Sequence, residues 1–351
     1  MRKFLFNATT PPKVGVLPEG PHNRLSDVAG VTVGQVTLNQ GNIQTGVTVI
    51  YPHHKDLFLH KVAAGTSVIN GFGKSIGLIQ LEELGVIETP IALSNTFAVP
   101  ILAQAQIRQA FTKHPQIGRE WPTVNPLVLE CNDGILNDIQ AFAIQEAHYY
   151  DACSQQQVYI EQGSVGAGRG MRSFGLKGGI GTASRYVSAD KQHLVSALVL
   201  SNFGALPYLQ IQGHAIGQQI EALQQLEAQI DKGSIIIILA TDAPLDARQL
   251  KRLSMRAAAG LARTGSNYGH GSGDIAVAFS TSNIISHDKT DNLNPTALIH
   301  ESALNDFFNA AAEATEQAII NALWYATEVT GRNGHHCPTL MQHLQKLELI
   351  G

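Results

Sequence analysis

Residues 260–281 read GLARTGSNYGHGSGDIAVAFST and join a helical pattern to a buried strand. Upstream of the loop, apolar residues recur at helical spacing: Leu250, Leu253, Ala257 and Leu261. This spacing predicts a helix over about 246–262. Downstream, residues 274–279 form an almost continuous apolar run, which is typical of a buried strand. The stretch therefore predicts helices packed on a sheet, with a glycine-rich loop between them.

Further strands and a second helix are indicated elsewhere in the chain. Residues 30–38 and 46–50 alternate apolar and polar positions, whereas 194–200 and 234–240 are almost wholly apolar. A second helix is predicted from near Ser302, with Gly331 and Asn333 expected to end it. Its apolar face carries Leu304, Phe307, Phe308, Ala311, Thr315, Ala318, Ile319 and Ala322. Because the chain has no Pro/Ser-rich linker and no repeat, a single domain over 1–351 is predicted.

Composition narrows the class of protein. Of the 351 residues, 44% are hydrophobic and 15% charged, which supports a sizeable core. The net charge of −4 provides no reason to expect nucleic acid or an anionic membrane as a partner. The three cysteines, Cys131, Cys153 and Cys337, are too few and too far apart for a disulfide framework, which favours a reducing compartment. The first apolar run ends at Asn7, so no signal peptide is expected, and a soluble cytoplasmic protein is predicted.

Ser272 stands between Gly271 and Gly273, where self-cleavage chemistry is feasible. The hydroxyl would attack the carbonyl one residue upstream, and glycines on both sides leave no Cβ in the way. Hydrolysis of the resulting ester would leave Ser272 with a free α-amine, whose pKa lies near 8. That amine can take the proton of its own hydroxyl, so no histidine is needed. The alternative interpretation is an ordinary glycine-rich turn before a strand.

Segments along nearly the whole chain resemble the family of DmpA-type aminopeptidases, which comprises L-aminopeptidase/D-amidase-esterases and β-aminopeptidases. The matching segments are RLSDVAGVTVGQVT (24–37), GVTVI (46–50), INGFGKSIGLIQLEELGVIETPI (69–91), LECNDGILNDI (129–139), GSVGAGRGM and KGGIGTASR (within 163–185), ATDAPLDARQLKRL (240–253), GLARTGSNYGHGSGDIAVAFST (260–281) and AAAEATEQAIINAL (310–323).

This resemblance implies an α+β fold with a four-layer αββα sandwich of the N-terminal-nucleophile type. It further implies self-cleavage between Gly271 and Ser272 into subunits 1–271 and 272–351. Members of the family release N-terminal residues from small peptides, amides and esters, some accepting D- or β-amino acids. They use no metal or cofactor and form homo-oligomers of the paired subunits.

Two further residues are candidates for the catalytic machinery. Asn202 ends a predicted buried strand, where its amide could stabilise an oxyanion; alternatively it only turns the chain toward Gly204. Glu316 lies beside the apolar face of its helix, where a carboxylate could hold the new ammonium and tune its pKa. Alternatively Glu316 is a solvated helix-edge residue, as Glu313 and Glu328 are expected to be. The family places a hydroxyl two residues before this acid, whereas this chain has Ala314 there and Thr315 as a substitute.

Glu130 is the candidate for binding the substrate's ammonium group. Its neighbour Asp133 and the pair Asn137–Asp138 compete for this role, and all of them have the alternative of capping turns. Structural roles are expected for Asp242, at a turn, and for Arg263, at a helix end. The glycine-rich segment 163–181 is expected to pack tightly and to form part of a cleft wall.

Competing motifs predict other chemistry. Residues 73–77 read GKSIG and match a nucleophile elbow at Ser75, with His335 or His336 as partner, but no strand is evident before Gly71. The same two histidines lack zinc-site spacing, so a surface pair is preferred. At the level of function, the alternatives are an acyltransferase on the same architecture and an unprocessed, non-catalytic binding protein.

Overall fold

Two β-sheets form the centre of the molecule in the computed structural model, which describes residues 5–224, 233–288 and 296–351. The six-stranded sheet has the order β4 (Val86–Ile87), β3 (His60–Gly71), β12 (Gly273–Ser286), β11 (Ser234–Thr241), β10 (Leu194–Asn202), β9 (Gly179–Tyr186). The four-stranded sheet has the order β1 (Thr32–Gln40), β2 (Ile43–Tyr51), β5 (Ile91–Asn95), β6 (Leu127–Cys131). Two small pairs accompany them: β7 (Arg172–Ser173) with β8 (Leu176–Lys177), and β13 (Val329–Thr330) with β14 (His336–Cys337).

The two sheets pack face to face through an apolar layer. The four-stranded sheet supplies Ile50, Leu93 and Leu129 to it, and the six-stranded sheet supplies Leu198, Ile236 and Phe279, all fully buried. A strand that is covered by helices on one face and by the second sheet on the other needs apolar side chains on both faces. This explains the near-continuous apolar runs of β10 and β11. The strands predicted over 30–38, 46–50, 194–200, 234–240 and 274–279 are confirmed as β1, β2, β10, β11 and β12.

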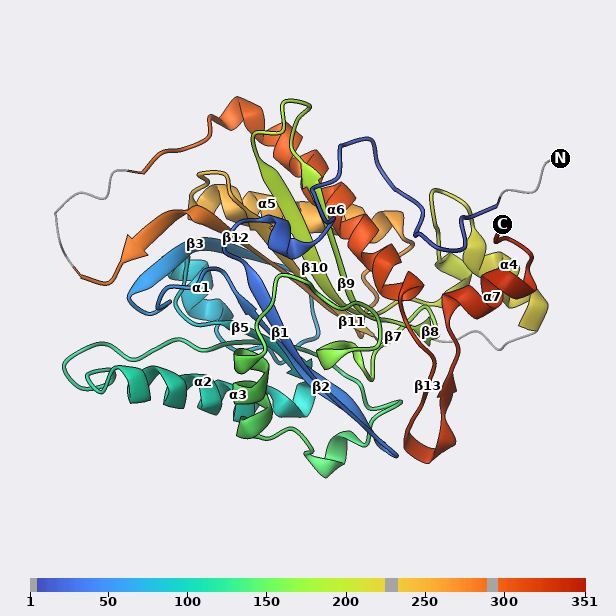
Figure 1. The fold of residues 1–351 in the computed structure, drawn as a ribbon, viewed down its shortest axis with the longest axis horizontal. Helices are drawn as coiled ribbons and strands as arrows, with labels where there is room; N and C mark the ends of the chain where they lie inside the picture. The colour runs from blue at the N-terminus through green and yellow to red at the C-terminus, as the bar shows by residue number, and fades with distance from the viewer. Residues whose placement is uncertain (1–4, 225–232, 289–295) are drawn as a thin grey trace.

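Helices cover the outer face of each sheet (Figure 1). Helix α5 (Ala247–Arg263) and helix α6 (Leu304–Trp324) lie on the six-stranded sheet, and α2 (Val99–Lys113) and α3 (Glu146–Ser154) lie on the four-stranded sheet. The predicted four-layer αββα sandwich is thereby confirmed. The remaining helices are α1 (Leu78–Leu84), α4 (Ile216–Gln224) and α7 (Leu340–Lys346).

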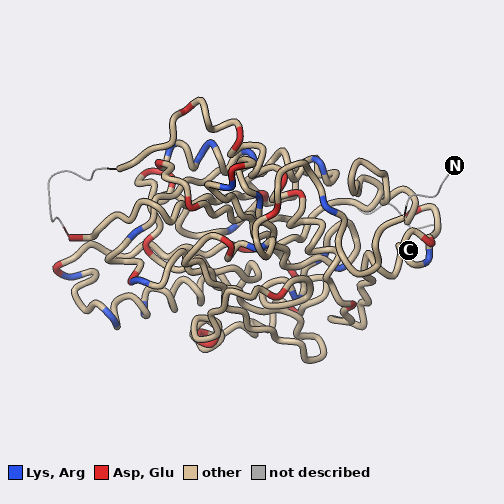
Figure 2. Tube along the Cα trace, turned by 45° about the horizontal axis from the view of Figure 1, so that its top comes forward, with Lys and Arg blue, Asp and Glu red and all other residues tan. Residues whose placement is uncertain are grey.

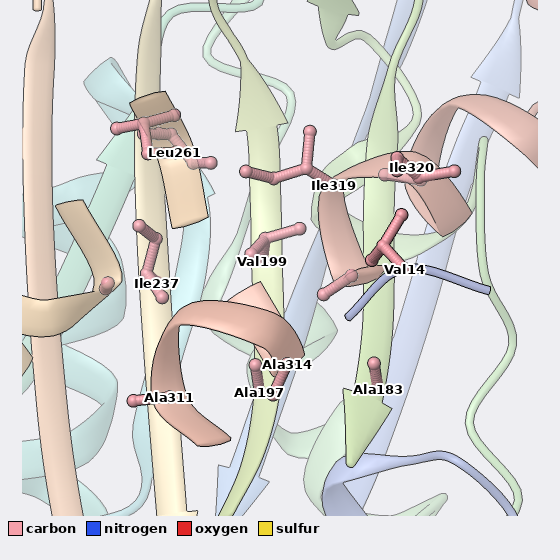
Figure 3. Close-up of a cluster of buried hydrophobic side chains, with 14 of the residues drawn as sticks. Val14, Ala183, Ala197, Val199, Ile237, Leu261, Ala311, Ala314, Ile319 and Ile320 are labelled. Carbon is pink, nitrogen blue, oxygen red and sulfur yellow. The ribbon is translucent and has the colours of Figure 1, made fainter. Parts of the chain in front are cut away.

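Small side chains let α6 lie close to the sheet. Figure 3 shows Ala314 of this helix next to Ala197 of β10, with Ala183 on the neighbouring strand β9 and Ala311 on the side of β11. At Gly181 the approach is closer still, since a Cβ added there would lie 1.9 Å from the carbonyl oxygen of Ala318. The packing role expected for the glycine-rich segment is confirmed at this position.

The two predicted helices have different outcomes. The first is confirmed as α5, and Asp246 caps it by accepting the N–H of Gln249 at 2.7 Å. The second ends at Trp324, so the prediction that Gly331 and Asn333 end it was wrong. Beyond the helix, Thr327 exchanges two hydrogen bonds with Ser164, and these contacts draw the chain away from the helix axis.

The prediction that Glu313 is a solvated residue was also wrong. It is only 6% exposed and accepts the backbone N–H groups of Val16 and Leu17, at 3.0 Å each. The carboxylate also lies 3.6 Å from the guanidinium of Arg185, which is fully buried. Glu313 therefore holds the N-terminal segment against α6, a long-range contact that helical periodicity does not reveal.

Charges of both signs are interspersed along the described chain (Figure 2). In the part that the structure describes, no helix has the length and apolar character needed to cross a membrane.

Candidate active site

Ser272 is placed by the loop that leaves α5 and enters β12. Its side chain is buried, and its Oγ donates a hydrogen bond of 2.5 Å to Oδ1 of Asp274, which is also buried. The neighbouring Gly273 is required by space, since a Cβ there would lie 2.6 Å from the carbonyl oxygen of Phe72. The predicted nucleophile thus lies directly before the first residue of the central strand β12, beside a carboxylate.

The backbone around Ser272 is clamped from several directions. The N–H of Ser272 donates to the carbonyl of Gly269 at 2.9 Å, which closes a turn over the Gly271–Ser272 peptide. The Nδ2 of Asn70, near the end of β3, donates to the carbonyls of Gly269 and Ser272. The N–H of Gly273 donates to Oγ of Ser234 at 3.0 Å. These contacts fix the position of the Gly271–Ser272 peptide, the bond that would be cut, relative to the sheet.

Glu130 reaches the same corner of the molecule from the other sheet. Its Oε1 accepts the N–H of Lys74 at 2.8 Å, and its Oε2 accepts the hydroxyl of Thr96. A Cβ added at Gly73 would lie 3.8 Å from this Oε1 and 3.3 Å from Cδ1 of Ile275. The loop at Gly73 therefore separates Glu130 from the first residues of β12 by little more than one layer of atoms.

The thiol of Cys131 is influenced by the charges of both carboxylates. Burial raises its pKa well above the ordinary value, and the charges of Glu130 and Asp274 raise it further. An electrostatic effect from both acids requires both to lie near the same buried sulfur. Glu130 and Asp274 are 144 positions apart in the sequence, yet the charges of both act on this one buried thiol between the sheets.

Asn202 ends β10 and faces a cavity, as the sequence suggested. Its Oδ1 accepts the N–H of Arg172 at 2.8 Å, and its Nδ2 donates to the carbonyl of Asn132 at 3.0 Å. The cavity has a volume of about 510 Å³, and all three residues line it. One hydrogen of the amide is engaged with Asn132, and Nδ2 carries a second one.

Glu316 lies in the helical layer. Its Oε2 is 3.4 Å from a guanidinium nitrogen of Arg263, the last residue of α5. Burial raises the pKa of the carboxyl group, and the charge of Arg263 opposes that effect. Among the described residues, no hydrogen bond or ion pair joins Glu316 to Ser272. Ala314 is part of the apolar core, and Oγ1 of Thr315 is buried without a hydrogen bond, so neither provides a hydroxyl partner.

Two of the residues that compete with Glu130, Asp133 and Asn137, belong to a buried polar network, whereas Asp138 is half-buried. Asp133 is 1% exposed and accepts a hydrogen bond of 3.0 Å from Nδ2 of Asn137. Asn137 in turn accepts the N–H of Gln44 at 3.0 Å, which ties the loop to β2. Burial raises the pKa of Asp133 to about 7. This network favours the structural interpretation for both residues.

The competing nucleophile elbow at Ser75 does not assemble. The statement that no strand precedes Gly71 was wrong, because β3 ends at that residue and α1 follows at Leu78. However, the hydroxyl of Ser75 is buried without a hydrogen bond, and both His335 and His336 are exposed on the hairpin of β13 and β14. Across residues 5–224, 233–288 and 296–351, no group of three or more His, Cys, Asp or Glu side chains is arranged for a metal ion.

Three residues of this corner escaped the sequence interpretation: Asp274, Asn70 and Ser234. The motif around Ser272 contained a signal for the first of them, since residues two apart on a strand project from the same face. Asn70 and Ser234 carried no comparable signal, because only the pairing of β3 and β11 with β12 brings them to Ser272.

Known proteins of the same architecture match the chain over most of its length. The beta-peptidyl aminopeptidase BapA of Sphingosinicella microcystinivorans is 38% identical over 341 residues, which cover 90% of this chain and 85% of that protein. Among solved structures, a beta-aminopeptidase from Burkholderia sp. superimposes with a TM-score of 0.87 at 35% identity, covering 95% of this chain and 96% of that one.

The L-aminopeptidase D-Ala-esterase/amidase of Ochrobactrum anthropi superimposes equally well. Its TM-score is 0.87 at 31% identity, with 97% of this chain and 98% of that chain covered, and it is described as a variant of the N-terminal-nucleophile hydrolase fold. The model of peptidase family S58 matches residues 23–337. The chain therefore belongs to peptidase family S58, among the serine aminopeptidases of the N-terminal-nucleophile fold.

Proposed function

We propose that the chain cuts itself between Gly271 and Ser272 and then acts as an aminopeptidase with Ser272 as nucleophile. Cleavage would produce subunits 1–271 and 272–351, joined by the pairing of β12 with β3 and β11. The observation that carries the proposal is the placement of Ser272. Its hydroxyl is buried at the start of a central strand, its peptide bond lies in a clamped turn, and Glu130 lies beside the adjoining loop at Gly73.

The new α-amine of Ser272 would serve as the base in each catalytic cycle. With a pKa of about 7.7–8.0, a large share of the amine is neutral near pH 8 and can accept the hydroxyl proton. Ser272 Oγ would then attack the substrate carbonyl and form an acyl-enzyme, which water hydrolyses. Asn202 would supply an N–H to the oxyanion, since it lies at the level of Gly273 in the same sheet.

Glu130 would bind the α-ammonium of the substrate, which explains a requirement for a free N-terminus. The carboxylate is oriented by Lys74 and Thr96, so a charged partner meets it in a fixed position. The substrates would be small peptides, amides or esters, and the names of the relatives favour β-amino acids among them. Glu316 would act as a positioning residue. Its ion pair with Arg263 holds the end of α5, where the loop that leads to Ser272 begins.

This chemistry requires no metal or cofactor, because the serine supplies both nucleophile and base. The assembly proposed is a homo-oligomer of paired subunits in the cytoplasm.

Denaturing electrophoresis of the purified protein tests the proposal. We expect two unequal bands, with Ser272 at the N-terminus of the smaller one by Edman sequencing, and hydrolysis of aminoacyl p-nitroanilides. Ser272→Ala should remain full-length and inactive. Ser266→Ala is the matched control, because it removes a hydroxyl from the same loop that contacts only the N–H of Tyr268 in the described structure.

A wild-type protein that stays intact and inert would sink the proposal and favour a binding protein. Adding an amino-acid amide or hydroxylamine as acceptor separates hydrolysis from acyl transfer. Predominant transfer to the acceptor would move the assignment to an acyltransferase.

A further inference from the structure

The uncut chain has no base of the kind that the mature enzyme would use. Before cleavage, the nitrogen of Ser272 is an amide that donates to the carbonyl of Gly269, and an amide nitrogen has no basic lone pair. Self-cleavage nevertheless begins by removing a proton from the Ser272 hydroxyl. Another group within hydrogen-bond reach must therefore accept that proton in the first and only turnover of the precursor.

We propose that Asp274 is the general base of self-cleavage; this inference rests on the function proposed above. The Oγ of Ser272 donates to Oδ1 of Asp274 at 2.5 Å, so proton transfer requires no movement of either side chain. Both residues are buried, which excludes bulk water as a competing acceptor. Other described carboxylates near the loop make different contacts: Glu130 is bound to Lys74 and Thr96, and Glu316 to Arg263.

The fixed backbone keeps the electrophile within reach while the proton leaves. Asn70 donates to the carbonyls of Gly269 and Ser272, on either side of the peptide that is cut. Phe72 donates its N–H to the carbonyl of Ser272 at 3.2 Å. With both flanks held, the Gly271–Ser272 peptide has little freedom to move relative to Oγ, which favours an intramolecular attack.

The step balances without any further reagent. As Ser272 Oγ bonds to the carbonyl carbon of Gly271, its proton passes to Asp274. The tetrahedral intermediate then breaks its bond to the Ser272 nitrogen, and the proton held by Asp274 is transferred to that nitrogen. The product is an ester between Gly271 and Ser272 Oγ, with a free α-amine and an ionised Asp274. Water hydrolyses the ester, which leaves a carboxyl group on Gly271 and restores the hydroxyl.

The structure thus implies two bases that act in succession on one hydroxyl. Asp274 serves once, and the α-amine it liberates serves in every later turnover. Loss of the carboxylate should accordingly slow processing far more than it slows a chain that has already been cut.

The experiment follows cleavage of full-length protein by denaturing electrophoresis for wild type, Asp274→Asn, Ser272→Cys and Ser272→Cys/Asp274→Asn. Asp274→Asn keeps the shape and removes the base, so cleavage should slow by about 10²- to 10⁴-fold. A thiol has a pKa near 8.5 and ionises without help. The double variant should therefore cleave much faster at pH 9 than at pH 6, and recover most of the rate of Ser272→Cys there.

Glu88→Gln is the matched control, because Glu88 is another buried carboxylate, and its contacts are with Asn125, Gln80 and Lys61 rather than with the loop of Ser272. It should cleave as wild type does. Circular dichroism and the urea midpoint identify a variant that has failed to fold. For such a case Asp274→Glu, which restores a carboxylate, should recover cleavage relative to Asp274→Asn.

Two results would overturn the assignment of Asp274. One is cleavage of Asp274→Asn at the wild-type rate; the other is a double variant whose rate at pH 9 is no higher than at pH 6. In both cases a wild type that is cut at Ser272 leaves the proposed aminopeptidase intact. A wild type that is never cut instead removes the proposed function itself.

Discussion

Asn202 and Gly273 lie at one level of the six-stranded sheet, two strands apart, with Ser234 between them. Asn202 pairs with Ser234 across β10 and β11, and Oγ of Ser234 accepts the N–H of Gly273. At a strand spacing of about 4.8 Å, this arrangement places the backbone of Asn202 roughly 10 Å across the sheet from that of Gly273. The side chains of Asn202 and Ser272 extend from these two positions, which provides the basis for the first prediction.

Asn202→Ala should lower kcat by about 10²- to 10³-fold with little change in KM, since an oxyanion donor acts mainly in the transition state. The measurement is steady-state hydrolysis of an aminoacyl p-nitroanilide. Asn202 also binds Arg172 and Asn132, so the variant should lose about 1–3 kcal/mol of stability. Asn283→Ala, at the far end of β12, is the control. An unchanged kcat in a folded Asn202 variant would leave the residue with only its structural contacts.

Glu130→Gln should raise KM for substrates with a free α-amine by about 10- to 100-fold, because a charge-assisted hydrogen bond contributes about 1.5–3 kcal/mol. Esters whose amine is acylated should be hydrolysed equally by variant and wild type. Thr96→Val is the graded comparison, since it keeps the charge and removes one donor to the carboxylate. If KM rises equally in Glu130→Gln for substrates with a free amine and for those with an acylated amine, Glu130 supports the shape of the site and does not bind the ammonium.

Glu316→Gln and Arg263→Gln should have similar, non-additive effects on the rate of self-cleavage. The ion pair joins the two residues and half of the Arg263 side chain is exposed, so each effect should be modest, about 2- to 5-fold. A double-mutant cycle on the rate of band conversion measures the coupling. A large loss of kcat in Glu316→Gln that is independent of Arg263 would instead indicate direct contact with the ammonium.

Asp133 should make the stability of the fold depend on pH. Burial raises its pKa to about 7 in the folded chain, whereas the ordinary value is 3.8. The folded state therefore binds the proton more tightly, and the free energy of unfolding should fall as pH rises from about 4 to about 7, then level off. The contribution of this group is at most about 4 kcal/mol.

Urea unfolding of wild type and Asp133→Asn between pH 4.5 and 8 checks this dependence. The wild-type midpoint should fall over that range by more than the midpoint of the variant. Asp151→Asn, which removes an exposed carboxylate from α3, should follow the wild type. Parallel pH profiles for wild type and Asp133→Asn would show that Asp133 titrates as an ordinary carboxyl group.

Much of the fold and the nucleophile could be predicted from local patterns. Runs such as 194–200 and 234–240 are apolar on both faces because they lie between two layers, and α5 carries its cap and apolar stripe within 17 residues. Elements with weaker local signals were not predicted: β5 and β6 are five residues long, and α1 and α7 are seven. Their formation depends on packing against neighbours that lie far away in the sequence.

The sequence by itself determined that Ser272 lies between glycines at the entry to a buried strand, and the order of acids and amides around it. Only the tertiary structure decided which of those groups face the hydroxyl. Asp274 contacts it directly, Glu130 is bound to Lys74 and Thr96 beside the adjoining loop, and Glu316 is bound to Arg263 in the helical layer. The physical reason is that strand register and sheet packing are set by contacts between distant segments, and a displacement of one residue turns a side chain to the opposite face.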